Sequence, residues 1–526
     1  MNQLLSSTLC AVLLLAACTP RYDVVVAGGG TGGTAAAIAA ARGGARVLLV
    51  EESPWLGGML TAAGVSAIDG NYRLRGGLFG EFTDSLAARY GGYEALKSGW
   101  VSNILFNPAV GADILANMAR EAGVEFRFGT TVCHVEHFCR SERACHSEHL
   151  CPSERACHSE RSEESDWHLL LSDARRVRAR ILIDGTELGD VAAAAGAEEL
   201  QDRVSLQDMT YVAIVKEYDH PVPMERPEGY DRERYRNCCA HPLAENRDGF
   251  NPLGQQLWSP EMMLSYGRLP DGHIMINWPV CGNDIFLDYL SMPRDSVYRL
   301  AKARTLGFLY FLQNELGYSN LGVADDVFPS ADGLPFYPYY REARRFAGKD
   351  TMTVEAAKEP YRFDLYTRAV AVGDYPVDHH HMQNPRREEL SHLWFGQIPS
   401  FSVPLGVVIP VNVEDLLLAD KSISVSWEMN GATRLQPVVT GLGQAAGTLA
   451  ALAVKKGCHP SEVPVPEVQA ALLDQGCYLL PFLDLKPSDP GFRELQEAGV
   501  RGQVKGVGRT VGWSNETWVK PPDYER

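Results

Sequence analysis

One short run of the chain combines groups that exchange protons. Residues 374–383 read DYPVDHHHMQ and place Asp378 beside three consecutive histidines. In an extended conformation Asp378 and His380 point to one side, and His379 and His381 point to the other. A carboxylate beside an imidazole fixes its tautomer and raises its basicity, as removal of a hydroxyl proton requires. His380 is therefore the first candidate for a general base, and the alternative is a surface loop with adventitious metal affinity.

Two arginines elsewhere are candidates for binding an anionic substrate. Arg341 lies in FYPYYREARR (336–345), where four aromatic residues precede three arginines. Aromatic rings stack on sugars or other flat molecules, and arginine binds a carboxylate with two hydrogen bonds. Arg434 lies in NGATRLQP (430–437), at the start of a predicted helix. The alternative for both arginines is an ion pair with a neighbouring carboxylate.

The elements that position such groups begin with a glycine cluster. Residues 24–37 read VVVAGGGTGGTAAA, a β-branched run followed by Gly28, Gly30 and Gly33 in the spacing G-x-G-x-x-G. The first glycine makes a tight turn, the second lets the backbone approach a pyrophosphate, and the third lets helix and strand pack closely. The helix that follows directs unpaired N–H groups and its positive dipole end at the phosphates.

A second predicted strand, ARVLLVEE (45–52), places Glu51 at its tip. A carboxylate there accepts hydrogen bonds from both ribose hydroxyls of an adenosine and disfavours a 2′-phosphate. The glycine pattern alone is a weak signal, since any glycine-rich loop matches it. Strand, helix and carboxylate together predict a dinucleotide site.

Further motifs decide which dinucleotide this is. They are SPWLGGML (53–60), RILIDGTELGDVAAAAG (180–196), YYREARRFAGKDTM (339–352), GDYPVDHHH (373–381) and the run from Asn412 to Gly457. In this order they resemble the FAD-dependent oxidoreductase family with a glutathione-reductase-like FAD fold, some members of which are labelled xanthan lyases. The resemblance covers most of residues 22–460. It is specific for the family and not for a substrate.

The resemblance implies an α/β fold with a Rossmann-like FAD-binding domain, three layers around a parallel sheet, and an inserted α+β substrate domain. The FAD-binding domain is expected to be discontinuous, from 22–200 and 402–457. The substrate domain is expected over 201–401. The extension 458–526 resembles a surface-layer-homology unit and is expected to serve packing or cell-surface contact.

The resemblance also implies residues that hold FAD, beside the three motif glycines and Glu51. They are Gly57, Gly58, Asp184, Thr186, Asp190, Asp420 and Gly431. The turn at Asp184–Asp190 would close over the cofactor, and Asp420 would face the ribityl chain. The helix that starts near Leu435 would stabilise the anion formed when the flavin accepts a hydride. Asn277, Asn283 and Asp284 match a family-like stretch, with a turn as the alternative.

Composition and the N-terminal run bear on partners and location. The formal net charge of −17 provides no basic stripe, so no nucleic-acid partner is expected. The apolar run 9–17 is too short to span a bilayer, and LAAC (15–18) resembles a lipobox, which predicts a removed signal peptide (1–18) and a lipid anchor on Cys18. The protein is then expected in the bacterial cell envelope, periplasmic or at the cell surface. No Lys or Arg precedes the run, and the alternative is a buried first strand in a cytoplasmic protein.

A cysteine-rich repeat interrupts the first predicted domain at 136–166. Cys, Ser and Glu recur there every six residues, and five of the chain's twelve cysteines lie in or beside it. These are Cys133, Cys139, Cys145, Cys151 and Cys157. Zinc sites use closer C-x2-4-C pairs, so the repeat predicts a solvated low-complexity insert and no metal site.

These observations together predict an enzyme, an FAD-dependent oxidoreductase. It would transfer a hydride between FAD and a small polar substrate, with carbohydrates among the candidates. One alternative is a xanthan-type polysaccharide lyase, in which His380 removes a proton beside a uronate carboxylate that Arg341 neutralises. The other is a non-catalytic surface binding protein on a flavin fold.

Overall fold

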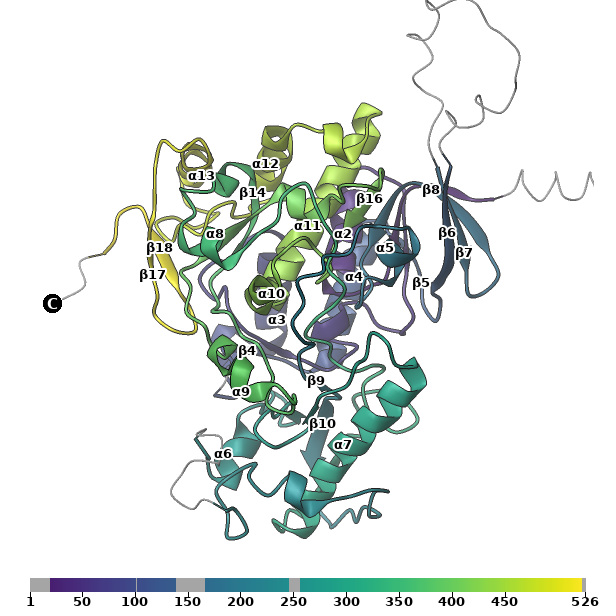
Figure 1. The fold of residues 1–526 in the computed structure, drawn as a ribbon, viewed down its shortest axis with the longest axis vertical. Helices are drawn as coiled ribbons and strands as arrows, with labels where there is room; N and C mark the ends of the chain where they lie inside the picture. Colours follow the sequence, from purple (N-terminus) through teal and green to yellow (C-terminus); the bar gives the residue numbers. More distant parts are fainter. Residues whose placement is uncertain (1–18, 101, 139–165, 246–255, 523–526) are drawn as a thin grey trace, which may run out of the picture.

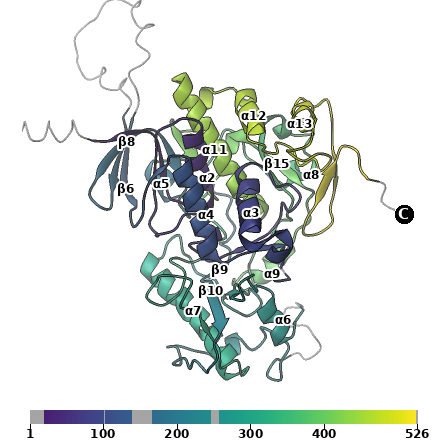
Figure 2. The ribbon, with the colours of Figure 1, turned by 180° about the vertical axis from the view of Figure 1, so that it is seen from behind.

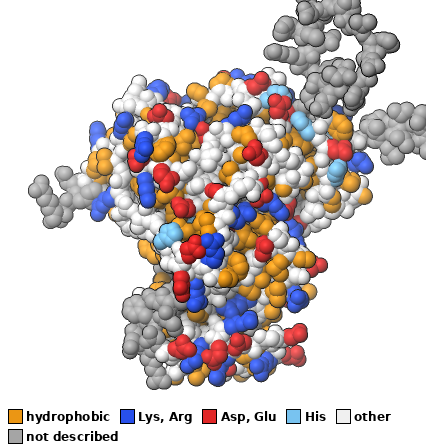
Figure 3. Space-filling view, in the orientation of Figure 1, with side chains coloured by type: hydrophobic (Ala, Val, Ile, Leu, Met, Phe, Trp, Pro, Cys, Tyr) orange, Lys and Arg blue, Asp and Glu red, His pale blue; other side chains and the backbone are white. Residues whose placement is uncertain are grey.

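The structure is a computed structural model and describes residues 19–100, 102–138, 166–245 and 256–522. The described chain forms a larger α/β body and a smaller part beneath it (Figure 1), each with its own hydrophobic core. Lysines and arginines are interspersed with acidic residues on the face that Figure 3 shows. The signal peptide predicted at 1–18, with Cys18, lies outside the described residues.

A largely parallel sheet forms the centre of the larger body. Its order is β5-β2-β1-β8-β7-β6, and β16 pairs with the end of β8. The strands are β1 (Arg21–Ala27), β2 (Val47–Val50), β5 (Glu125–Arg127), β6 (Val132–Phe138), β7 (Asp166–Leu171), β8 (Arg176–Asp184) and β16 (Leu416–Leu418). The strands β5, β2, β1, β8 and β16 run parallel, while β7 and β6 are antiparallel additions. The apolar runs of β1 and β2 are buried because elements cover both faces.

Two helices far apart in sequence pack together against this sheet. They are α2 (Thr31–Arg42) and α11 (Gln436–Lys456), which run side by side in both views (Figures 1 and 2). A Cβ atom on Gly443 would lie 2.1 Å from the Gly32 carbonyl oxygen, and one on Gly447 would lie 2.1 Å from that of Ala36. Glycines therefore let the two backbones touch. Within the described ranges α11 alone is long and apolar enough to cross a membrane, and most of it is buried inside the protein.

Shorter elements complete the larger body. These are β3 (Ala67–Ile68), α3 (Gly77–Tyr90), β4 (Ile104–Leu105), α4 (Pro108–Glu121), α5 (Asp190–Ala194), α8 (Val354–Lys358), β14 (Ala369–Gly373), α9 (Arg387–Leu390), β15 (Phe401–Pro404) and α10 (Trp427–Thr433). The predicted insert 136–166 falls between the paired strands β6 and β7, and residues 139–165 lie outside the described chain. The predicted fold class, an α/β body with a parallel-rich sheet and an added α+β part, is confirmed.

The smaller part is built on a three-stranded antiparallel sheet. Its elements are β9 (Met209–Thr210), β10 (Ala213–Glu217), α6 (Pro260–Ser265), β11 (Ile274–Ile276), β12 (Asp284–Ile285), α7 (Arg294–Asn314) and β13 (Leu321–Val323). Its core includes residues between Met59 and Tyr340 and also Val439 of α11, whereas Phe346 and β14 residues Val370–Val372 belong to the core of the larger body. β14 packs on α11, and the domain boundary at 401 stays a prediction.

The C-terminal extension packs on the larger body rather than standing apart. It contains α12 (Val465–Asp474), α13 (Phe492–Val500), β17 (Val507–Arg509) and β18 (Glu516–Trp518). Leu480 and Phe482 form a small core with Ala369 at the start of β14. The extension is therefore part of the fold.

Candidate active site

A first cavity of about 200 Å³ opens where β1, β2 and β8 end. Ligands of parallel α/β sheets bind at these carboxyl ends. Among the predicted cofactor residues, this cavity is lined by Gly28, Gly30, Glu51, Thr186 and Asp190. Arg294, Tyr298, Tyr337 and Tyr340 close it from the side of the smaller part.

Backbone contacts explain the glycines of the loop. Gly28 has a φ of 92°, and a Cβ there would lie 2.6 Å from the backbone of Gly185. A Cβ on Gly33 would lie 2.0 Å from the Gly28 carbonyl oxygen. Gly30 precedes α2 and faces the cavity, where the first turn of the helix presents N–H groups. This bare cradle beside a helix N-terminus fits the pyrophosphate of FAD.

Glu51 is buried at the tip of β2, as the motif predicts. Its carboxylate accepts hydrogen bonds from the Gly29 N–H at 2.7 Å and the Ser53 N–H at 2.8 Å. Burial raises the pKa of Glu51 to about 7. The carboxylate keeps further lone pairs on the cavity wall, as a ribose hydroxyl requires.

Gly57 and Gly58 lie against the glycine loop and not in the first cavity's wall. The Gly57 N–H donates to the Gly29 carbonyl at 2.9 Å, and the Thr31 hydroxyl donates to the Gly57 carbonyl at 2.7 Å. A Cβ on Gly58 would lie 2.6 Å from the Gly30 Cα. These glycines hold the loop in place around the cradle.

Asp184 and Thr186 build the turn beyond β8. Asp184 accepts from the Thr186 N–H at 2.9 Å, the Thr186 hydroxyl at 2.7 Å and the Ala192 N–H at 2.6 Å. Its carboxylate is thereby occupied, and the pKa of Asp184 is raised to about 6 by burial. Asp190 pairs with Arg294 at 3.1 Å and with Arg344 at 2.8 Å. Thr186 and Asp190 face the cavity, while Asp184 supports them from behind.

Asp420 and Gly431 serve contacts that the sequence did not predict. Asp420 accepts from the Gly32 N–H in the first turn of α2 at 3.1 Å and pairs with the buried Lys421 at 2.9 Å. Lys421 also pairs with Glu187 at 2.5 Å. Gly431 lies in α10, where a Cβ would come within 2.4 Å of the His379 ring. Gly431 thus brings α10 close to the histidine run.

A second cavity, of about 460 Å³, lies between the two parts of the molecule. Its lining includes all four residues that the sequence proposed for chemistry, Arg341, Asp378, His380 and Arg434. Leu435 and Gln436, at the start of α11, lie in the same wall. Aromatic side chains form much of the remainder, namely Tyr72, Trp100, Trp258, Tyr266, Trp278, Tyr339, Tyr375, Trp394, Phe395 and Trp513.

Buried ion pairs join the charged groups of this cavity. His380 lies between two carboxylates, with Nε2 at 3.2 Å from Asp378 and Nδ1 at 3.3 Å from Asp284. Arg434 pairs with Asp378 at 3.0 Å, and Arg341 pairs with Asp284 at 3.2 Å. Burial alone would raise the pKa of Asp284, but Arg341 and His380 outweigh it and lower the value to about 2. The pKa of Asp378 is lowered for the corresponding reason, by His380 and Arg434.

The alternation predicted for the histidine run is present. His379 and His381 turn away from Asp378, with their ring nitrogens 3.2 Å apart. Burial lowers the pKa of His379 to about 3 and that of His381 to about 4. These two rings are therefore neutral at pH 7, and they pack around Trp427.

The position of His380 changes what the ring can do. An ionised carboxylate only accepts hydrogen bonds, so bonds to both Asp378 and Asp284 require a hydrogen on each ring nitrogen. The imidazole then has no free lone pair for a substrate proton while both bonds persist. His380 links Asp378 and Asp284 within the network.

Two residues of the second cavity, Asp69 and Trp513, were not predicted from the sequence. Asp69, which follows β3, lies in the wall of the second cavity, and its only local signal was an Asp-Gly turn. Trp513 reaches the cavity from the C-terminal extension, for which no part in the site was predicted. Asp284 was predicted only as a residue of the pocket or a turn, and the ion pairs show its part in the network.

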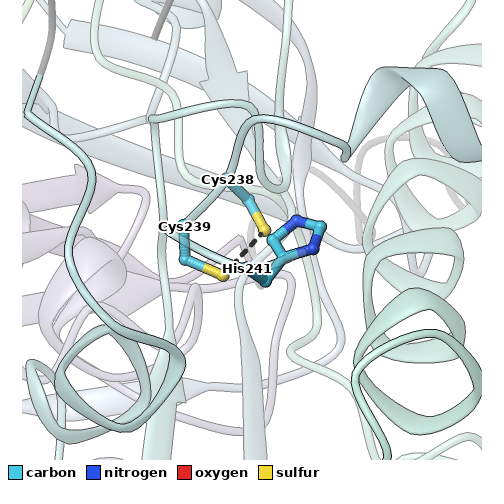
Figure 4. Close-up of side chains that lie close together, drawn as sticks. All are labelled: Cys238, Cys239 and His241. Carbon is cyan, nitrogen blue, oxygen red and sulfur yellow. Dashed lines mark hydrogen bonds between the residues drawn. The ribbon is translucent and has the colours of Figure 1, made fainter. Parts of the chain in front are cut away.

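Cys238, Cys239 and His241 form a separate buried cluster with metal-ligating atoms (Figure 4). The two sulfur atoms lie 3.6 Å apart. His241 is bonded at both nitrogens, with Nδ1 accepting from the Leu243 N–H at 3.2 Å and Nε2 at 2.8 Å from the Arg236 carbonyl oxygen. The histidine is thus engaged by its own loop, and we assign no metal to this cluster.

Comparisons with solved structures return hydroxylases and an amino acid oxidase at low similarity. OxyS anhydrotetracycline hydroxylase from Streptomyces rimosus is 13% identical over 91% of this chain and 72% of its own, with a TM-score of 0.35. CabE, an aromatic hydroxylase from angucycline biosynthesis, is 15% identical over 39% of each chain, with a TM-score of 0.24. NikD, an amino acid oxidase of nikkomycin biosynthesis, is 17% identical over 39% of this chain and 60% of its own, with a TM-score of 0.22.

The chain spans about two fifths of the length of CabE. A comparison with curated proteins finds no significant match. The model of one family, described as FAD dependent oxidoreductase, matches residues 23–472. That range includes the glycine cradle, Glu51, the histidine run and α11. The chain therefore belongs to the FAD-dependent oxidoreductase family, and FAD is its cofactor.

Proposed function

We propose that this enzyme oxidises a hydroxyl-bearing carbon of a small polar substrate, with a carbohydrate as the substrate class. The observation that carries the proposal is the meeting of Arg341, Asp378, His380 and Arg434 in one cavity with the start of α11. Bound FAD supplies the two-electron acceptor. Gly28, Gly30, Glu51, Thr186 and Asp190 are the residues that would hold it.

The protein's own groups bind and orient the substrate. The guanidinium groups of Arg341 and Arg434 are held by ion pairs, so their remaining N–H groups have defined directions. The Tyr339 hydroxyl lies 2.5 Å from Arg434 and extends this network. The indole walls exclude water and offer flat faces on which the apolar side of a sugar ring stacks.

A neighbouring cavity of about 680 Å³ supports a carbohydrate that extends beyond one ring. It shares Trp258, Trp394, Phe395 and Trp513 with the substrate cavity. Phe395 has a φ of 54°, a costly conformation for a bulky residue. That conformation places its ring against Trp513, with centroids 4.3 Å apart.

The ion pairs argue against the lyase alternative. Proton abstraction beside a uronate needs a cation that neutralises the substrate carboxylate. Arg341 and Arg434 are 1% and 3% exposed, and each already neutralises a buried aspartate. Redirecting either arginine to a substrate would leave that aspartate unpaired, which is costly. Hydride transfer needs no such cation.

The test is anaerobic mixing of the purified yellow protein with sugars and hydroxy acids. We expect flavin bleaching with at least one carbohydrate, and a His380→Asn variant that keeps its FAD should bleach at least tenfold more slowly. Absence of bleaching with every hydroxyl compound, in a protein that dithionite reduces normally, would contradict the proposal. It would favour the binding-protein alternative.

We also propose that Cys18 carries a lipid that anchors the mature protein in the bacterial cell envelope. The support is the LAAC run at 15–18, two residues before the chain enters β1 at Arg21. Mass spectrometry should find a diacylglyceryl group on Cys18, and Cys18→Ser should release the protein from membranes. An unmodified Cys18 in membrane-free extract would overturn this.

A further inference from the structure

Asp69 is a charged residue of the substrate cavity with no partner in the described chain. No hydrogen bond or ion pair to its carboxylate is found within the described ranges, although it lines the cavity beside Tyr72 and Tyr375. Asp378 and Asp284, the other carboxylates nearby, each pair with an arginine and with His380. The Asp378 Oδ1 atom has no hydrogen-bond partner among the described residues, but it is buried. Asp69 is thus a cavity carboxylate whose lone pairs remain open to a substrate.

The turn that carries Asp69 is anchored on both sides. Before it, the Ile68 carbonyl accepts from the Tyr72 hydroxyl at 2.9 Å and from the Ser102 hydroxyl. After it, Gly70 and Asn71 have φ values of 81° and 51°, and the Asn71 N–H donates to Asp374 at 2.6 Å. Glycine and asparagine adopt this left-handed conformation more readily than other residues, so both fit a tight turn here. These hydrogen bonds hold the turn at the cavity wall.

The same segment is tied to the start of α11. The Gln436 side chain donates to the Ala67 carbonyl at 3.1 Å, two residues before Asp69. Leu435 and Gln436 line the cavity with Asp69. Asp69 is therefore positioned relative to the helix end that the family places at the flavin.

The surroundings of Asp69 tune its protonation. Burial raises the pKa of Asp69 to about 7, with Asp378 raising it further and Arg434 opposing the shift. The other titratable groups that face it are Tyr72, Tyr266 and Tyr375, whose pKa values are raised by burial. Those phenols stay neutral across the physiological range. A group that titrates near neutral pH is suited to accepting and releasing a proton in each turnover.

We propose that Asp69 is the catalytic residue that accepts the substrate's hydroxyl proton, the role that the sequence suggested for His380. The inference rests on the proposed function. The substrate O–H bond breaks and its proton forms a bond with the Asp69 carboxylate. The oxygen electron pair becomes the second bond of a carbonyl, while the C–H hydrogen leaves with its electron pair to oxidised FAD, the acceptor of the family's chemistry. His380 and Arg434 position the substrate and keep Asp378 ionised.

The first test uses the FAD-loaded enzyme and its Asp69→Asn variant. The flavin reduction rate of the wild type should rise with pH to a plateau, with a midpoint near 7. Asp69→Asn should lose this rise and react about 10²- to 10⁴-fold more slowly, with the KM changed much less than kcat. Asp326→Asn on the outer surface is the matched control, and its pH profile should equal that of the wild type. An Asp69→Asn variant with an unchanged rate and pH profile would overturn the proposal.

The second test does not depend on turnover. Difference infrared spectroscopy of the resting protein should show, besides the band of Glu51, a second protonated-carboxyl component that disappears as the pH rises through about 7. This second component should be missing in Asp69→Asn, and the Glu51 component should be missing in Glu51→Gln. If no substrate bleaches the flavin but the second component is present, the proposed function fails and the titration of Asp69 stands. If bleaching occurs and the second component is absent, the Asp69 proposal fails alone.

A conservative variant guards against a folding artefact. Asp69→Glu keeps a carboxylate but moves it by one methylene group. It should retain the rise of rate with pH at a reduced maximum. If Asp69→Glu instead has the flat profile of Asp69→Asn while both keep FAD, the carboxylate is not the proton acceptor.

Discussion

The two cavities are constructed in opposite ways. The first is shaped by backbone, since Gly28, Gly30 and Gly33 touch other main-chain atoms and leave a bare cradle at the start of α2. The second is shaped by side chains, whose ion pairs join Arg341, Asp378 and Arg434 from separate segments. A backbone cradle suits a ligand of constant shape. A side-chain cavity can be re-formed for a different substrate without disturbing the cofactor site.

Charge separates the two cavities as clearly as construction does. Glu51 in the first cavity has backbone N–H donors but no ion-pair partner among the described residues, and burial raises its pKa to about 7. Asp284 in the second has Arg341 and His380, which lower its pKa to about 2 despite burial. Glu51 therefore remains an acceptor for ligand hydroxyls in the cofactor site, while Asp284 is neutralised by its ion pairs beside the substrate site.

Breaking an ion pair of the second cavity should have the largest effect. Arg434→Met leaves Asp378 buried without its cation, so we expect a loss of about 3–5 kcal/mol in unfolding free energy. Substrate oxidation should be lost in protein that still binds FAD. Urea unfolding and FAD absorbance measure the two effects. Arg362→Met is the control, because its ion pair with Glu359 is exposed and should contribute under about 1 kcal/mol. Equal losses of unfolding free energy in Arg434→Met and Arg362→Met would show that the buried ion pair contributes no more to stability than the exposed one.

Adding one methyl group to the cradle should damage the first cavity instead. Gly33→Ala places a Cβ 2.0 Å from the Gly28 carbonyl, and we expect a loss of about 3 kcal/mol with greatly weakened FAD binding. Gly44→Ala is the matched control. Gly44 has a φ of 95° but open space around it, so the cost should be about 1 kcal/mol with FAD affinity unchanged. Normal FAD affinity in Gly33→Ala would refute the backbone-cradle account.

The two acids should give stability opposite pH dependences in the FAD-free protein. The pKa of Glu51 is raised from 4.5 to about 7, so its contribution is full below about pH 4.5 and is lost as pH rises through 7, about 3 kcal/mol in all. The pKa of Asp284 is lowered from 3.8 to about 2, so its contribution is present above about pH 4 and is lost as pH falls through 2, about 2 kcal/mol. Urea unfolding of the wild type, Glu51→Gln and Asp284→Asn at pH values across these two ranges measures the contribution of each acid to the unfolding free energy. If the unfolding free energy of Glu51→Gln changes between pH 5 and 7 as much as that of the wild type, Glu51 and Asp284 do not give stability opposite pH dependences.

The smallest effect is expected at the rim of the second cavity. Trp513 is 54% exposed, so Trp513→Ala should change unfolding free energy by about 0.5 kcal/mol or less. Loss of a stacking face should raise the KM for a carbohydrate several-fold and leave kcat unchanged. Val507→Ala, on an exposed strand of the same extension, should alter neither. Unchanged KM in Trp513→Ala would place the substrate away from this rim.

Local motifs predicted the first cavity well. Strand β1, the glycine loop, α2 and Glu51 lie within one continuous stretch, so the spacing of residue types reported their geometry directly. The motifs also predicted that α11 returns to the loop, which its contacts with α2 confirm. Asp184 accepts from Thr186 and Gly431 packs on His379, contacts that the motifs did not predict, and the cofactor contacts expected of both residues stay predictions.

The sequence predicted several residues of the second cavity but not the ion pairs and hydrogen bonds that connect them. The alternation in the histidine run placed Asp378 beside His380, because extended chains alternate their side chains. Nothing local indicated that Asp284 would take the other ring nitrogen, 96 residues away. Nothing local indicated Asp69 or Trp513 as neighbours of the same space.

By itself the sequence determined the family and the cofactor, because several separate motifs occur in the order typical of that family. It also determined the backbone cradle, because the glycines that form it lie within a few positions of one another. The tertiary structure decided which carboxylate is paired and which is open, since burial and ion pairing arise only when distant segments meet. For this reason we propose Asp69, and not His380, as the proton acceptor. The difference is physical, because a buried group's protonation is set by what surrounds it and not by what adjoins it in sequence.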